Sequence, residues 1–405
     1  MGSARAVIDA AAGVEIAPCA PVELARLAKA HAYALGFELA GIAALGPADT
    51  ADAFDDWIDA GRAGVMHYLE RGAEKRRDSR RPLPGTTHAI VVALDYGGRE
   101  PSGPVARYAR GEDYHDVMDA KLRELHARLE ADVGRTIVGK PYVDTGPLLE
   151  RDLARRAGLG WFGKNTNLLN PTLGSFFFLG ALVLDLELET DAPFEADRCG
   201  TCTRCIDACP TNAIVAPREL DATRCISYLT IELKEEIALE LREPMGELIY
   251  GCDICQEVCP WNHRFARELK VPEFAPRAVL ASNDARTIAR EILAMSPSEF
   301  SVAFKGSPMK RAKLRGLKRN AAVALGNALD ASAVTVLSGA LSDDESLIRE
   351  HAAWALGKIR SPAALESLLS RAAIETDQRV RAVLRAAIAS HGDWPPSARR
   401  AASHS

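Results

Sequence analysis

Two runs of closely spaced cysteines constrain the fold of this chain more than any other feature. They consist of Cys199, Cys202, Cys205 and Cys209 before Pro210, and of Cys252, Cys255 and Cys259 before Pro260. The first run has the C-x2-C-x2-C-x3-C-P spacing of a 4Fe-4S site, in which closely spaced thiolates on one loop bind three irons and a remote thiolate binds the fourth. The second run has Ile249 in place of its first cysteine, and Cys225 is the only other cysteine nearby. We therefore expect Cys225 to complete the second site.

These eight cysteines are enough for two clusters. In two-cluster ferredoxins the last cysteine of each run binds the other cluster. This rule predicts one cluster on Cys199, Cys202, Cys205 and Cys259, and a second on Cys209, Cys225, Cys252 and Cys255. Zinc is the main alternative, because paired C-x2-C motifs also bind zinc, although zinc does not require the repeated x3-C-P ending. A disulfide framework is not typical of a long chain without a secretory signal, and the isolated Cys19 is expected to be a small apolar side chain.

The composition is that of an ordinary soluble protein. The chain has 405 residues, of which 47% are hydrophobic and 26% charged, so it has room for two or three domains. Its net charge of -5 does not by itself indicate a nucleic-acid partner. Charged residues interrupt the N-terminal stretch and no apolar run reaches membrane-spanning length, so we expect a cytoplasmic enzyme without a membrane partner.

Strands and helices are expected to alternate through residues 1–190, which predicts an α/β domain. Apolar sequence predicts strands at 37–45, 88–96 and 175–188, the last being a strand or a hairpin, and 139–147 is expected to be a short strand that ends in a turn. Helical periodicity predicts helices at 22–36, 52–68 and 115–131, and Pro147 is expected to begin another. The cysteine module is assigned to 191–270, a helical domain to 271–395 and a flexible tail to 396–405.

The C-terminal third repeats itself. The sequence Asn-Ala-Ala-Val-Ala-Leu-Gly at 320–326 returns as His-Ala-Ala-Trp-Ala-Leu-Gly at 351–357, with a weaker copy at 380–388. Paired helices at such a period stack into a HEAT-like solenoid, in which each repeat buries a face against the next. An ordinary helical bundle is the alternative.

Two other motifs are rejected. The glycines of 158–163 fit G-x-G-x-x-G and nearly fit a P-loop, but a helix is expected before them and no helix after them, so they are interpreted as allowing close backbone approach to a bulky partner. The segment from Asp113 through His115 to Met118 resembles D-x-H-x-x-G, by which some proteins give cobalt a histidine ligand. Met118 stands where that motif has its glycine, so no histidine ligand to cobalt is expected.

A basic run lies at the entry to the repeats. Residues 305–319 contain no acid, and we expect contacts to the phosphates of a macromolecule from Lys310, Arg311, Lys313, Arg315, Lys318 and Arg319. The alternative is a solvated surface, which is the commoner meaning of a charge run. From the residues alone, Asp144 is interpreted as organising the turn before a helix, and Glu150 and Arg151 as a surface pair.

Four stretches together resemble one family, the epoxyqueuosine reductases. They are Arg-Tyr-Ala-Arg-Gly-Glu-Asp-Tyr-His at 107–115, the segments 143–151 and 158–165, the cysteine module with 225–231, and the basic segment 310–327. The resemblance implies a cobalamin-binding α/β domain, then a ferredoxin-like module with two 4Fe-4S clusters, then an all-α HEAT-like repeat domain that binds tRNA. It implies reduction of epoxyqueuosine to queuosine at the tRNA wobble position, as a monomer supplied by an external low-potential electron donor.

The same resemblance implies roles for individual residues. Electrons are expected to pass from the clusters through cobalamin to the epoxide, with Asp144 as proton donor and Arg151 near the substrate. Contacts to cobalamin are expected from His67, Arg107, Asp144, Leu169, Ser227 and Asp253. We expect desolvation against the corrin to raise the pKa of Asp144, so that its carboxyl stays protonated near neutral pH.

Two other functions are considered. A reductive dehalogenase would also combine a corrinoid with two clusters, but the absence of a twin-arginine leader and the basic run disfavour it. A ferredoxin-type electron carrier with a scaffold tail would leave the N-terminal 190 residues without a role.

Overall fold

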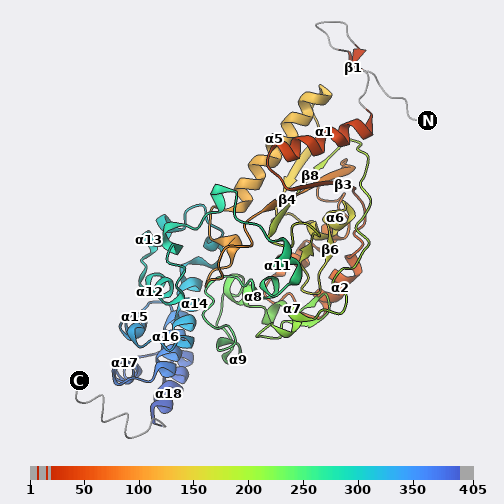
Figure 1. The fold of residues 1–405 in the computed structure, drawn as a ribbon. Coiled ribbons are helices and arrows are strands. Elements are labelled where there is room, and N and C mark those ends of the chain that lie inside the picture. Colours follow the sequence, from red (N-terminus) through yellow and green to blue (C-terminus); the bar gives the residue numbers. More distant parts are fainter. Residues whose placement is uncertain (1–6, 9–14, 17–19, 393–405) are drawn as a thin grey trace.

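The computed structural model describes residues 7–8, 15–16 and 20–392 (Figure 1). Cys19 and the tail expected from residue 396 lie outside these residues. The chain runs from a sheet with flanking helices, through the cysteine module, to a stack of helices at the far end of the molecule. Within the described residues, no helix is both long and apolar enough to cross a membrane.

An antiparallel sheet forms the centre of the N-terminal part. Its strand order is β3-β4-β8-β5, with bounds Leu39–Ala44, His88–Asp95, Phe177–Leu184 and Gly139–Tyr142 respectively. In the register, Ile90 lies opposite Ile42 on one side and Leu182 on the other. The strands expected at 37–45 and 88–96 are thus confirmed, and 175–188 forms a single strand, not a hairpin. Two short strands, β1 (Val7–Ile8) and β2 (Glu15–Ile16), pair separately.

Helices cover both faces of this sheet. Helices α1 (Pro21–Ala34) and α5 (Tyr114–Val133) pack on one face, and α6 (Glu150–Arg156) packs on the other (Figure 1). Strand β4 serves both cores, because alternate residues point to opposite faces. Its Ile90, Val92 and Leu94 face α1 and α5, whereas Ala89, Val91 and Ala93 face α6. Each large side chain buried in this way contributes about 1.5–3 kcal/mol, which fixes the ends of α5 and α6 relative to each other.

Two helix expectations are wrong. The helix expected over 52–68 ends early, as α2 (Ala51–Asp59), and is followed by two short helices, α3 (His67–Arg71) and α4 (Ala73–Arg77). Gly61 and Gly64 interrupt it with φ values of 69° and 58°, and a Cβ on Gly64 would lie 2.3 Å from the Tyr228 hydroxyl. The helix expected to begin at Pro147 begins at Glu150 instead, after an irregular loop that carries Asp144.

The cysteine module is built from short elements. The helices are α7 (Arg204–Asp207), α8 (Ile226–Ile231), α9 (Leu239–Arg242), α10 (Ile254–Glu257) and α11 (Pro260–Phe265). Strands β9 (Ile214–Ala216) and β10 (Glu219–Leu220) pair within it, and β6 (Trp161–Phe162) and β7 (Leu168–Leu169) pair in the glycine-rich loop before it. Pro260 begins α11, where its missing N–H costs no hydrogen bond.

The C-terminal helices stack in the manner expected of repeats. They are α12 (Ala285–Ala294), α13 (Pro297–Ala303), α14 (Lys313–Asn327), α15 (Val334–Ala340), α16 (Ser346–Ile359), α17 (Pro362–Ala372) and α18 (Gln378–Gly392). Helix α14 packs on α16, and α16 packs on α18. Added Cβ atoms at Gly326 and Gly357 would lie 2.9 Å from the Cα atoms of Ala355 and Ala387 respectively. The repeated Ala-Leu-Gly therefore allows the same close helix contact twice.

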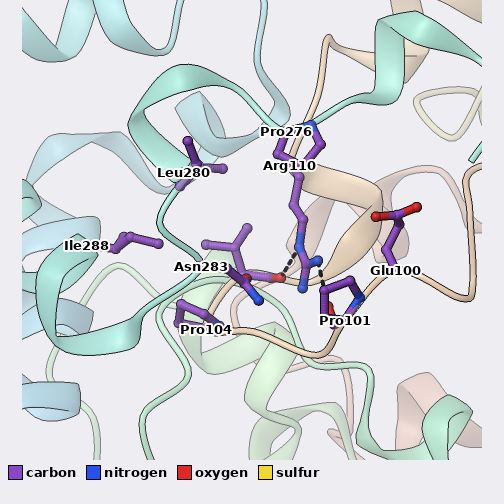
Figure 2. A pocket seen from close by; sticks show the side chains of 10 residues that line it. Glu100, Pro101, Pro104, Arg110, Pro276, Leu280, Asn283 and Ile288 are labelled. Atoms are coloured by element: carbon purple, nitrogen blue, oxygen red, sulfur yellow. Dashed lines mark hydrogen bonds between the residues drawn. The ribbon is translucent and has the colours of Figure 1, made fainter.

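A small cavity marks the junction between the sheet domain and the helical stack. It has a volume of about 150 Å³ and lies where the loop after β4 meets the segment before α12 (Figure 2). The guanidinium of Arg110 donates to the carbonyls of Val105 and Pro101 at 2.9 and 2.8 Å, and the Asn283 amide donates to Ser102. The Arg110 bonds brace the loop itself, and the Asn283 bond joins this loop to the segment before α12.

Candidate active site

The eight described cysteines include several that lie near enough to raise one another's pKa, although no three of the described side chains are placed as ligands of a single metal ion. Burial raises the pKa of Cys205, and the nearby Cys199 and Cys259 raise it further, while Cys259 is affected in the same way by Cys199 and Cys202. These four are the first set that the spacing predicts. Each of the eight is free of disulfide bonds in the described part of the chain.

The second set has the same character. Burial raises the pKa of Cys252 to about 12, and Cys225 and Cys209 act on it in the same direction. Burial also raises the pKa of Cys255, with contributions from Cys252 and Cys225. Buried thiols that oppose one another's ionisation bind a positively charged metal centre well, because the metal offsets the repulsion. The neighbours do not divide strictly into the two predicted sets, because Cys205 of the first set also acts on Cys255 of the second, so the grouping stays a prediction.

Asp144 lies on the loop between β5 and α6. Its φ of 56° is in the left-handed region, which costs a non-glycine residue roughly 1–3 kcal/mol and is commonest at functional sites. The backbone N–H donates to Oε1 of Glu150 at 2.7 Å, so the first residue of α6 holds this conformation. The Asp144 side chain is 67% exposed and remains accessible to a ligand.

The carboxylate of Asp144 faces the start of α5. Tyr114 donates its hydroxyl to Oδ2 of Asp144 at 3.0 Å, and Nε2 of His115 lies 3.5 Å from the same oxygen. The Tyr114 ring stacks on Phe178 of β8 with centroids 4.2 Å apart, and on His115 at 4.0 Å. Nδ1 of His115 is hydrogen-bonded to Asp113 at 2.6 Å. The sheet thus positions an acid, a phenol and an imidazole at one point.

The protonation states of this group differ from the sequence expectation. Desolvation opposes ionisation of Asp144, but the hydrogen bond and charge of His115, together with Tyr114, lower the pKa of its carboxyl. Burial acts against the His115 charge, yet Asp113 and Asp144 raise its pKa to about 9. Burial and the negative Asp144 raise the pKa of Glu150 to about 8. The expected raised pKa of Asp144 is therefore wrong for this arrangement, and its neighbours carry the protons at neutral pH.

Helix α3 and the basic run meet beside this group. Arg311 donates to both carboxylate oxygens of Glu232, at 2.5 and 3.0 Å, and its guanidinium lies 5.5 Å from the centre of the Tyr68 ring. Its positive charge also acts to lower the pKa of Asp144. Arg311 is thus a member of the basic run whose charge acts on the site.

The basic run is not uniformly available to a partner. Lys310 and Lys313 are exposed and have no carboxylate partner among the described residues, whereas Arg315 and Lys318 pair with Glu345 and Asp343. The expected tRNA contact from Arg319 is wrong. Its side chain is fully buried and donates to the carbonyls of Leu229, Leu233 and Glu235. Arg319 joins α14 to the cysteine module.

Three of the residues expected at cobalamin are buried. Arg107 and Asp253 pair with each other at 2.9 Å, with both side chains only 6% exposed, and Leu169 is 1% exposed. His67 is exposed, and Ser227 lies in the first turn of α8, next to the cluster set that contains Cys225.

Arg151 and Glu150 are not the surface pair considered above. The guanidinium of Arg151 donates to the carbonyl of Thr166, and Glu150 accepts from the backbone of Asp144. Sequence reasoning also missed His115, Tyr114 and Glu150 as members of the site. The only available signal was the density of polar and aromatic residues in 107–115.

Three protein-family models match this chain. A model described as epoxyqueuosine reductase QueG, DUF1730 matches residues 76–145, a 4Fe-4S double cluster binding domain matches 198–262, and HEAT repeats match 312–389. The last two matches confirm iron–sulfur clusters over zinc and HEAT-like repeats over a simple bundle.

Known relatives match nearly the whole chain. The epoxyqueuosine reductase of Xanthomonas campestris pv. campestris is 41% identical over 350 residues, covering 84% of this chain and 97% of that protein. A solved epoxyqueuosine reductase with a tRNA-Tyr epoxyqueuosine-modified stem loop is 33% identical with a TM-score of 0.81. The match covers 91% of this chain and 99% of that chain. The Bacillus subtilis enzyme, solved with its catalytic aspartate loop swung out of the active site, is 32% identical with a TM-score of 0.81. That match covers 91% of this chain and 99% of the Bacillus subtilis chain. The chain therefore belongs to the epoxyqueuosine reductase family.

Proposed function

We propose that this enzyme reduces epoxyqueuosine to queuosine at the wobble position of tRNA. The observation that carries the proposal is the position of Asp144, which lies 3.5 Å from a proton-holding histidine and whose pKa is also lowered by the charge of Arg311 in the basic run. Proton chemistry and a surface for polyanions thus meet at one point. The relative solved with a modified tRNA stem loop supports the same substrate class.

The reaction requires electrons and protons in equal number. Converting an epoxide to an alkene breaks two C–O bonds and forms one C=C bond, and the oxygen leaves as water after taking up two electrons and two protons. We assign Asp144 as the group that gives a proton to the leaving oxygen. Its exposed carboxylate and left-handed backbone support this role, as does the catalytic aspartate loop of the Bacillus subtilis relative.

The residues beside Asp144 suit cobalamin. Val65 and Tyr68 are 43% and 40% exposed, and the hydroxyl of Tyr228 accepts the Val65 N–H at 3.0 Å, which fixes this apolar segment to α8. We propose that this apolar surface, His67 and Ser227 hold the cofactor between Asp144 and the second cysteine set. When bound, cobalamin supplies a cobalt centre able to pass electrons to the epoxide.

The remaining cofactor contacts and the clusters are assigned from the same geometry. Arg107, Leu169 and Asp253 are proposed to act through backbone atoms, because their side chains are buried. Arg151, anchored at Thr166, is proposed to lie near the substrate. The two cysteine sets are assigned one 4Fe-4S cluster each, and each cluster carries one electron at a time.

Helix α14 offers a surface for tRNA phosphates. Its first turn has no acid and begins at Lys313, although a helix N-terminus normally favours negative charge. A phosphate at this end would interact favourably with the positive end of the helix dipole. It would also balance the charges of Lys310 and Lys313, for which the described residues provide no carboxylate partner. We therefore propose that the anticodon arm lies over this end of α14, so that its modified base can reach Asp144.

The chain is proposed to act as a cytoplasmic monomer, since tRNA is found in the cytoplasm, and to receive electrons from an external low-potential donor. Its division into 1–190, 191–270 and 271–395 is proposed as the three functional parts.

A direct assay tests this function. Anaerobically prepared enzyme, supplied with cobalamin and a strong reductant, should convert epoxyqueuosine-containing tRNA to queuosine-containing tRNA, as measured by nucleoside mass spectrometry. An aryl bromide serves as the competing substrate. Debromination without formation of queuosine would contradict the proposal and favour the dehalogenase class.

A further inference from the structure

Two acid–base side chains of the α5 N-terminus, Asp113 and His115, lead in a line to Asp144. Asp113, at the N-cap of α5, contacts Nδ1 of His115 at 2.6 Å, and Nε2 on the other side of the ring lies 3.5 Å from Oδ2 of Asp144. Asp113 also accepts the backbone N–H of His115 at 3.1 Å, and its own N–H donates to the Gly306 carbonyl at 2.8 Å. The ring is thus held between two carboxylates with little freedom to turn.

The proposed reaction asks more of Asp144 than one carboxyl can give. Two protons are consumed per epoxide, whereas Asp144 carries at most one and is ionised at neutral pH in this arrangement. A carboxylate that has given up its proton must be reloaded from a neighbour. The imidazolium of His115, with a pKa of about 9, is the nearest group that is both charged and able to donate.

We propose that His115 is a proton relay that reloads Asp144, and that Asp113 is the positioning residue that holds the ring in line. This inference rests on the proposed function. In the relay step the Nε2–H bond of His115 breaks and an O–H bond forms at Oδ2 of Asp144, which leaves neutral imidazole beside an unchanged Asp113 carboxylate. His115 then regains a proton from solvent. Its side chain is 28% exposed, but Nε2 itself is buried in this arrangement, so the return step requires the Asp144 carboxyl to move away from the ring. No electron moves in this step.

The other groups that face this pair do not replace the relay. Tyr114 donates to the same Oδ2, but burial raises its pKa far above neutral, so it orients Asp144 without supplying protons. Glu150 has a raised pKa, yet the contact it makes is to the backbone N–H of Asp144 and not to its carboxylate. Arg277 and Arg311 act on Asp113 and Asp144 as fixed positive charges.

His115 is also poorly placed to bind cobalt. Both of its ring nitrogens face carboxylates, and Met118, which occupies the glycine position of the cobalt-binding motif, is fully buried on the core-facing side of α5. The relay therefore assigns a role to His115, whereas the comparison with the cobalt-binding motif assigned it none.

The experiment compares the pH dependence of single-turnover reduction in wild-type enzyme and His115→Gln. An acid relay works while protonated, so wild-type rates should hold up to about pH 9 and fall above it. Without the relay, Asp144 must take protons from water, and the His115→Gln rate should fall about tenfold per pH unit from a much lower pH. His126→Gln is the matched control, because His126 lies on the same helix but contacts the Ile137 carbonyl.

A readout independent of activity accompanies the profile. In cofactor-free protein with labelled histidine, the NMR titration of His115 should lie near pH 9 and move toward its usual 6.5 in Asp113→Asn. A titration near 6.5 in wild type, or a His115→Gln profile parallel to wild type at every pH, would overturn the relay. If wild-type enzyme forms no queuosine at any pH, the proposed function fails. This outcome differs from failure of the relay, in which wild-type enzyme is active and its pH profile can be measured.

Discussion

The cysteine module and the group around Asp144 are the two chemically active regions of this molecule, and their electrostatics are opposite. In the module, buried thiols raise one another's pKa, so each set resists ionisation as a whole. In the Asp144 group, two carboxylates flank one histidine and stabilise its charge. The module therefore needs a positively charged cofactor to balance it, whereas the protein assembles the Asp144 group from its own charges.

This difference predicts two kinds of failure. A change in the module should cost the cofactor, and with it electron transfer. A change at Asp144 should leave every cofactor in place and cost only the proton step. The predictions below separate the two.

The largest effect is expected from Cys225→Ala. Loss of one of four ligands should remove the second cluster, so the protein should fall from about eight irons to about four and lose queuosine formation. Iron analysis and electron paramagnetic resonance of the reduced protein measure this. Cys19→Ala is the control, because neither cluster assignment uses Cys19. Full iron and both cluster signals in Cys225→Ala would show that another group completes the second site.

Asp144→Asn should impair the group around Asp144 and leave the cysteine module intact. The amide keeps the shape of the carboxylate but cannot donate the proton, so single-turnover reduction should fall about 10²–10⁴-fold. Iron content, cobalamin binding and tRNA affinity should be unchanged. Asp116→Asn, an exposed acid in the first turn of α5, is the matched control. Near-normal turnover per bound cobalamin would remove Asp144 from the proton step.

The two regions also differ in how far their sequence predicts them. Each cysteine set comes mainly from two short loops with fixed spacing, so the ligand grouping follows from local sequence and one rule for paired clusters. The Asp144 group comes from α5, the loop after β5 and the start of α6. Its members are brought together by the register of the sheet, which no local pattern contains. For His115, local sequence therefore offers only a comparison with a cobalt-binding motif.

Residues that the sequence places on the surface also show where local sequence fails to predict the structure. Arg319 reads as part of a basic run, but its guanidinium satisfies three carbonyl oxygens of the cysteine module. The loop after α2 is likewise shaped by a distant residue, because a Cβ at Gly64 would lie 2.3 Å from the hydroxyl of Tyr228. Strand β4 was predictable because continuous apolar sequence is the usual mark of a strand buried on both faces.

The smallest effect is expected on tRNA binding, where neither chemical region is touched. Replacing Lys310 and Lys313 by alanine should leave single-turnover chemistry on saturating tRNA unchanged and weaken binding. Each lost phosphate contact removes roughly 0.7–0.9 from the slope of log K against log salt. Binding titrations at several salt concentrations measure this slope.

Two controls make this binding test specific. Lys270→Ala, an exposed lysine after α11, should leave the slope unchanged. Arg319→Ala should act differently, because it removes no surface charge but leaves buried carbonyl oxygens without a donor, at a cost of about 1–3 kcal/mol each. We therefore expect Arg319→Ala to lower the unfolding temperature while the folded fraction keeps the wild-type salt slope. A reduced slope in Arg319→Ala, or an unchanged slope in the double lysine variant, would place the tRNA surface elsewhere on the helical stack.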